Sequence, residues 1–77
     1  MEKSIRVLVV DDHNVVREGL RAMLESRQGI EVIGEAGDGD QAVSQARLLQ
    51  PDVILMDLEM PRKNGISATY EIMACLL

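Results

Sequence analysis

Val-Ile-Leu-Met-Asp-Leu-Glu-Met-Pro, residues 53–61, decides the fold of this chain, because an apolar run ends there in an acid and then a turn. A short and nearly continuous apolar run is typical of a strand covered on both faces, as in a parallel sheet. A second such run, Ile5 to Val10, also ends in acids, at Asp11 and Asp12. Because ligands of open parallel sheets sit at the carboxyl ends of the strands, we expect Asp11, Asp12 and Asp57 to meet at a functional edge.

Six elements are predicted from the hydrophobic pattern and from the turn residues between the apolar segments. In chain order they are a strand at about 5–10, a helix at about 14–27, a strand at about 31–36, a helix at about 40–49, a strand at about 52–57 and a helix at about 65–77. Strands that alternate with helices over short connections form right-handed βαβ units. The sequence therefore predicts an α/β fold, a parallel sheet with helices on both faces.

Helix ends and inward faces are predicted from local residue types. Asn14 and Asp40 are expected to cap the first and second helices, because short polar side chains accept hydrogen bonds from free backbone N–H groups. The first helix is expected to end at Gln28-Gly29. Its inward face is predicted from the helical spacing to contain Val16, Leu20, Met23 and Leu24.

Composition indicates a small acidic domain. The 77 residues carry a net charge of −5, and the only aromatic residue is Tyr70, so the core is predicted to be thin and aliphatic. No basic cluster exceeds Arg62-Lys63, which argues against nucleic-acid binding by this segment. A single cysteine and no apolar run long enough to span a bilayer lead us to expect a cytoplasmic protein without membrane contact.

Three carboxylates at one edge predict a particular chemistry. They repel one another unless a cation neutralises them, and Mg²⁺ suits such a site because it prefers oxygen ligands. A carboxylate can also attack phosphorus and form an acyl phosphate. We therefore expect a Mg²⁺ site in which one carboxylate accepts a phosphoryl group.

The chain resembles the N-terminal part of a response-regulator receiver domain (CheY-like) of the NarL/LuxR-type transcriptional subclass. The segments that carry the resemblance are VLVVDDH, VVREGL, GEAGDGDQA and PDVILMDLEMPRKNG. A pair of acids followed at this distance by D-x-x-M-P-x-x-x-G is a specific combination. The resemblance implies a flavodoxin-like fold, truncated here to three βα units with strand order 2-1-3.

The resemblance also implies roles for individual residues. It implies that Asp57 accepts a phosphoryl group from a sensor histidine kinase. Mg²⁺ would be bound by Asp57, directly by Asp12, mainly through water by Asp11, and by the backbone carbonyl of Glu59. The residues implied to shape the loop after the acceptor are Met60, Pro61 and Gly65. The chain would then be a signalling module, not an enzyme, that regulates a separate C-terminal DNA-binding domain.

The chain departs from the family pattern after its third helix. Receiver domains carry a Ser or Thr at the end of a fourth strand and a Lys at the end of a fifth, and this sequence contains neither strand. In the order 2-1-3 the third strand is an apolar sheet edge, and such edges pair with other chains. We therefore expect self-association, through this edge or by exchange of an element.

Two alternative functions are consistent with the same residues. A Mg²⁺-dependent phosphohydrolase that forms an aspartyl phosphate is weakly supported, because such enzymes carry D-x-D after the first strand and this chain has D-D. An interaction fragment without phosphotransfer activity would follow from the missing strands. His13 invites a reading as a metal ligand, but an exposed residue before the first helix is the favoured interpretation.

Overall fold

β1 (Ile5–Val10) is the central strand of a three-stranded parallel sheet, flanked by β2 (Ile30–Ala36) and β3 (Val53–Met56). The computed structural model describes residues 3–58, 60 and 62–76. The strand order β2-β1-β3 is the predicted one, and the α/β fold is confirmed. β1 lies in the middle because Val7 to Val10 are buried on both faces of the sheet, as their apolar side chains require.

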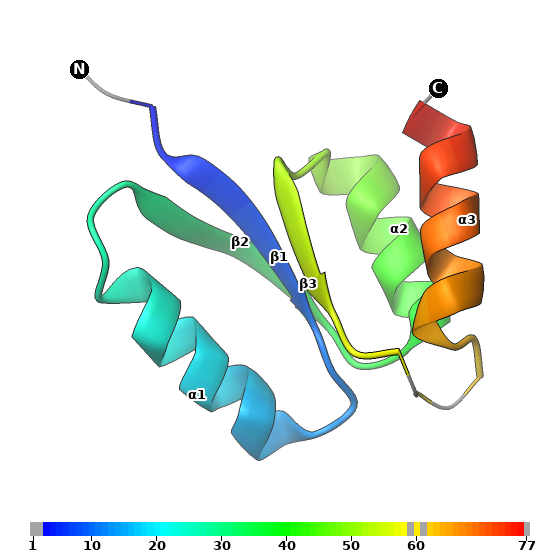
Figure 1. Cartoon of the computed structure of the whole chain (residues 1–77), viewed down its shortest axis with the longest axis horizontal. Helices are drawn as coiled ribbons and strands as arrows, with labels where there is room; N and C mark the ends of the chain where they lie inside the picture. The colour runs from blue at the N-terminus through cyan, green and yellow to red at the C-terminus, as the bar shows by residue number, and fades with distance from the viewer. Residues whose placement is uncertain (1–2, 59, 61, 77) are drawn as a thin grey trace.

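Three helices cover the two faces of the sheet (Figure 1). α1 (Asn14–Glu25) lies on one face, and α2 (Gly39–Leu49) and α3 (Gly65–Leu76) lie side by side on the other. The core is accordingly divided in two. Leu8 and Val10 pack against α2 and α3, whereas Val7 and Val9 face α1. Alternation along β1 therefore assigns successive side chains to different halves of the core.

α1 packs less completely than its sequence pattern predicts. Leu20 and Leu24 contact the core, but Val16 is 43% and Met23 55% exposed. The physical reason is the position of α1, which lies against β2 and β1, so that only part of its apolar stripe meets the sheet. The prediction of four inward residues was thus wrong for Val16 and Met23.

The ends of α1 also differ from the prediction. His13 occupies the cap position without a side-chain cap bond, and the Asn14 side chain accepts a hydrogen bond from Arg17 instead of from the backbone. The helix ends at Glu25, before the predicted Gln28-Gly29. There the Ser26 hydroxyl donates to the carbonyl of Met23 at 2.7 Å, which satisfies a group of the last turn.

α2 is capped by Asp38, not by the predicted Asp40. The Asp38 carboxylate accepts a hydrogen bond from the backbone N–H of Gln41 at 2.8 Å, and its backbone is extended, as a cap requires. The helix begins one residue earlier than predicted, at Gly39, so Asp40 lies in its first turn. At the other end Gln50 adopts a left-handed conformation with φ of 47°.

β2 lies at one edge of the sheet. Its register with β1 shifts between Val7 and Leu8, where Ile33 is an extra residue in β2 before Gly34. β3 pairs with β1 from Val7–Val53 to Val10–Met56 and is shorter than predicted. No helix among the described residues is long and apolar enough to cross a membrane.

Candidate functional site

Asp11 and Asp57 directly follow β1 and β3, and the sheet holds both by backbone hydrogen bonds. The N–H of Asp57 donates to the carbonyl of Val10 at 3.0 Å, and the N–H of Asp11 donates to the carbonyl of Ala36 at 3.1 Å. Because these bonds continue the ladders of the parallel sheet, the two side chains leave the same edge. The backbone hydrogen bonds at the ends of β1 and β3 thus place the two acids at the same edge.

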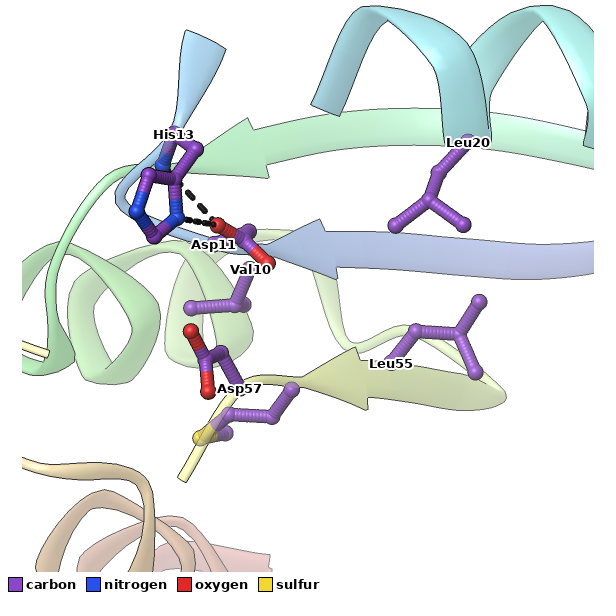
Figure 2. Close-up of a pocket in the computed structure, with 7 residues that line it drawn as sticks. Val10, Asp11, His13, Leu20, Leu55 and Asp57 are labelled. Atoms are coloured by element: carbon purple, nitrogen blue, oxygen red, sulfur yellow. Dashed lines mark hydrogen bonds and ion pairs between the residues drawn. The ribbon is translucent and has the colours of Figure 1, made fainter. Parts of the chain in front are cut away.

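Four side chains converge at this edge. Asp11, Asp12, His13 and Asp57 each offer one ligand atom, and these atoms all lie within 4.8 Å of one another. Asp11 and Asp57 are half-buried, whereas Asp12 is exposed. Figure 2 shows the carboxylates of Asp11 and Asp57 near each other, with the His13 ring beside Asp11. The structure therefore brings together the three acids that the sequence singled out, although their individual roles stay predictions.

Asp11 and Asp57 lie at one end of a cavity of about 520 Å³. Its lining comprises Val10, Asp11, His13, Leu20, Leu55, Met56 and Asp57. In Figure 2 the polar side chains gather beyond the strand ends, while Leu20 and Leu55 lie back along α1 and β3. The site thus has a polar end and apolar walls.

His13 belongs to the cluster, although its sequence position favoured an exposed residue before the first helix over a site residue. It is exposed, as predicted, yet its Nδ1 lies 2.8 Å from Asp11 Oδ1 and 3.0 Å from Asp12 Oδ1. The chain turns back on itself here, because the His13 backbone N–H also donates to Asp11 Oδ1 at 2.9 Å. The signal available in the sequence was the direct succession of two acids and a histidine before a helix.

These contacts shift the pKa of both partners. The hydrogen bond from the His13 backbone N–H is the main cause that lowers the pKa of Asp11, with the His13 ring adding to it. The hydrogen bond to Asp11 is the main cause that raises the pKa of His13, followed by the charge of Asp12. The neighbouring carboxylates thus favour the protonated form of His13 relative to a free imidazole.

The donor set fits a hard divalent cation. Three carboxylates close together supply oxygen ligands and more negative charge than the single imidazole offsets. Mg²⁺ takes such ligands and keeps several waters, whereas an imidazole nitrogen suits Zn²⁺ and other transition metals better. Asp11, Asp12 and Asp57 are therefore the residues that could hold Mg²⁺, with the His13 ring beside them.

The loop after Asp57 approaches the site through Gly65, one of the predicted loop residues. Gly65 is buried, its N–H donates to the carbonyl of Leu58 at 2.9 Å, and a Cβ on it would fall against the carbonyl oxygen of Asp57. Glycine is thus required where α3 begins. Met60 packs against the core beside α2 and α3. The predictions for Glu59 and Pro61 concern positions outside the described residues.

Two cations of the same loop bind the loop to the neighbouring helices. Arg62 lies 3.6 Å from the Asp38 carboxylate, and Lys63 pairs with Glu71 on α3 and, at 3.8 Å, with Asp40 on α2. Arg62 has a positive φ of 70°, so the backbone turns sharply at this point. The loop is therefore held in place by charge as well as by Gly65.

Comparisons with known proteins agree with this geometry. A family model described as the response regulator receiver domain matches residues 7–75. The transcriptional regulatory protein LiaR of Bacillus subtilis is 59% identical over 68 residues, which are 88% of this chain and 32% of that protein. A protein-glutamate methylesterase/protein-glutamine glutaminase of Alkalilimnicola ehrlichii is 56% identical over 70 residues, 91% of this chain and 18% of that protein.

Solved structures give the same result. The receiver domain of the response regulator NarL from Mycobacterium tuberculosis matches with a TM-score of 0.93 and 34% identity, over 99% of this chain and 61% of that one. The chain spans less than a third of the length of the two curated relatives. The two relatives bear names of different kinds, one a transcriptional regulatory protein and the other a methylesterase/glutaminase.

Proposed function

The chain belongs to the response regulator receiver domain family, and from this membership we propose that it is a phosphoacceptor module in which Asp57 receives the phosphoryl group. The supporting observation is the convergence of Asp11, Asp12 and Asp57 at the ends of neighbouring strands. Asp57 is the acid that follows β3 and faces the other two. Family membership and this placement favour a receiver over the phosphohydrolase alternative.

The proposed reaction transfers a phosphoryl group from a phosphorylated histidine of a sensor kinase to Asp57. A carboxylate oxygen of Asp57 attacks phosphorus, an O–P bond forms, and the N–P bond of the donor breaks with its electron pair left on the imidazole nitrogen. The product is an acyl phosphate. Asp57 suits this role because its backbone is held by Val10, which fixes the direction from which the carboxylate meets a donor.

Receiver domains bind Mg²⁺ at an acidic cluster, and we assign this cluster to the same purpose. Asp12 and Asp57 would hold the ion directly, Asp11 mainly through water, and the Glu59 carbonyl would supply a further ligand. Bound there, Mg²⁺ offsets the repulsion between an anionic acceptor and an anionic donor. The chain's own contribution is to hold the carboxylates together against their mutual repulsion.

The output of the intact protein is proposed from the relatives. LiaR is named a transcriptional regulatory protein, and the NarL receiver shares the fold, so we favour a separate DNA-binding domain regulated by this module in the cytoplasm. The methylesterase relative shows that receivers of this sequence type also occur with enzymatic outputs. DNA contact is assigned to the output domain, since this segment has a net charge of −5.

Self-association is a second proposed property, supported by the edge position and the exposed apolar side chains of β3. Within the described residues β3 pairs with β1 alone, and Val53 and Leu55 are 41% and 38% exposed. An edge of this kind offers backbone hydrogen-bonding groups and apolar side chains to a second copy of the chain. Edge pairing or exchange of an element would cover these backbone groups and side chains.

Mass spectrometry of the intact protein with Mg²⁺ and acetyl phosphate tests the phosphoacceptor. We expect the wild type to gain one phosphoryl group and Asp57→Asn to gain none, because the amide is not a nucleophile of comparable strength. Asp52→Asn is the matched control, since Asp52 is an exposed acid at the opposite end of the same strand. A phosphoryl group retained on Asp57→Asn, or lost from Asp52→Asn, would contradict the assignment.

A further inference from the structure

Arg17 connects three segments around the acidic site. It lies in the first turn of α1, and its side chain is 18% exposed. Its Nη1 donates to the backbone carbonyl of Asp11 at 2.5 Å, its Nη2 to the side chain of Asn14, and its Nε to Glu35 Oε1 at 3.2 Å. One planar guanidinium thus joins the end of β1, the start of α1 and the edge strand β2.

The contact with Arg17 is the second hydrogen bond that fixes the backbone of Asp11. The Asp11 N–H is already bound by the carbonyl of Ala36 on β2, at 3.1 Å. Arg17 binds the carbonyl on the other side of the same residue, and hydrogen bonds to a charged donor are stronger than neutral ones. Both backbone groups of Asp11 are therefore fixed just before the chain turns into Asp12 and His13.

Glu35 holds the guanidinium in this orientation. Its two oxygens are shared between Arg17 and Arg21, the latter at 2.6 Å from Oε2. Arg21 also pairs with Glu25 on the next turn, and its partners Glu25 and Glu35 both lie outside the turn at residues 11–14. The two arginines thus share one carboxylate, but only Arg17 extends to the acidic turn.

We propose that Arg17 is a positioning residue for the acidic site, which holds the turn of Asp11 and Asp12 so that their carboxylates face Asp57. The part that concerns Mg²⁺ rests on the proposed function. Residues that orient metal ligands without touching the metal affect its affinity by about 10- to 100-fold. Arg17 acts in this way through the Asp11 carbonyl, with Glu35 as the anchor on β2.

The experiment compares Arg17→Gln with Arg21→Gln, since both variants lose one charge and one partner of Glu35. In the metal-free protein, amide hydrogen exchange is measured at residues 11–14. We expect faster exchange there in Arg17→Gln and wild-type exchange in Arg21→Gln. Calorimetric titration with Mg²⁺ should show an affinity about tenfold weaker in Arg17→Gln and unchanged in Arg21→Gln.

Other outcomes separate this proposal from the phosphoacceptor assignment. Equal effects of both variants would show that Arg17 only forms a structural ion pair, and would overturn the proposal. Wild-type amide exchange and wild-type Mg²⁺ affinity in Arg17→Gln would also overturn it. A wild type that binds no Mg²⁺ would contradict the proposed function, whereas exchange at residues 11–14 would still decide the role of Arg17. Arg17→Lys, which keeps the charge but not the planar fork, should shift both readouts in the same direction by less, and serves if Arg17→Gln does not fold.

Discussion

At the scale of single residues, Glu35 on β2 accepts hydrogen bonds from two arginines of α1. Arg21 binds one carboxylate oxygen at 2.6 Å and Arg17 binds the other at 3.2 Å. The hydrogen bond from Arg21 is the main cause that lowers the pKa of Glu35, with the bond from Arg17 acting in the same direction. The folded state therefore favours the ionised carboxylate more than the unfolded chain does.

The stability conferred by Glu35 should depend on pH with a definite sign. Because the pKa is lower in the folded state, the stabilisation is present above the unfolded value near 4.5 and disappears as the pH falls through the folded pKa. Glu35→Gln should be less stable than wild type at pH 7, by up to about 1 kcal/mol, and should approach wild type in acid. Urea unfolding from pH 7 to pH 3 measures this.

Glu31→Gln, an exposed acid on the same strand, controls for the loss of one negative charge. A constant difference between wild type and Glu35→Gln across the whole pH range would contradict the linkage, because the difference would then not arise from titration.

At the scale of elements, α2 begins at a buried acid that the helix itself uses. Asp38 is 5% exposed, and its carboxylate accepts hydrogen bonds from both the backbone and the side chain of Gln41, while Arg62 lies 3.6 Å away. The same residue therefore ends the turn after β2, starts α2 and contacts the loop after Asp57. Asp40, the sequence-based choice, is exposed in the first turn.

Asp38→Ala should lower the free energy of unfolding by about 1–2 kcal/mol, because a helix cap is lost and the backbone N–H of Gln41 loses its acceptor. Asp40→Ala should cost less, since it removes only an exposed charge near the helix N-terminus and a 3.8 Å pairing with Lys63. Thermal or urea unfolding of the two variants gives the comparison. Equal losses would show that helix charge, not capping, dominates at this position.

At the scale of the whole molecule, the sheet is covered unequally. α2 and α3 bury one face, including Leu8 and Val10, but α1 covers only the part of the other face formed by β2 and β1 (Figure 1). Val53 on β3 is left 41% exposed. Exposed apolar surface beside a strand edge favours contact with another chain, since burial stabilises by roughly 25 cal/mol per Å².

Sedimentation at tens of micromolar should therefore give a mass above the 8.5 kDa of one chain. Val53→Lys should shift the population to the monomer, because a lysine on an edge strand cannot be buried in a paired sheet. Leu48→Lys is the control, as Leu48 is 76% exposed on α2, away from β3. A monomeric wild type, or equal dissociation in both variants, would contradict the proposed edge pairing.

Sequence alone determined the elements, the parallel sheet and the set of three acids. Short continuous apolar runs such as Val53 to Met56, bounded by turn residues, are typical of strands in a parallel sheet, and acids that follow parallel strands leave the same edge. Coverage of β3 differs from the sequence pattern, because Val53 and Leu55 stay 41% and 38% exposed. The strand order 2-1-3 came from the family resemblance. These features depend on residues close together in the chain, or on motifs of fixed spacing, and could therefore be read directly.

Tertiary structure alone decided which polar side chain bonds to which. Asn14, a good cap by type, binds Arg17, and Asp38 caps α2 in place of Asp40 because α2 starts at Gly39. Likewise the salt bridge between Arg17 and Glu35 joins residues 18 positions apart. A polar side chain with several possible partners bonds to the one that lies nearest in the folded state. Those distances depend on how α1 and α2 pack on the sheet, and a local sequence pattern does not encode this packing.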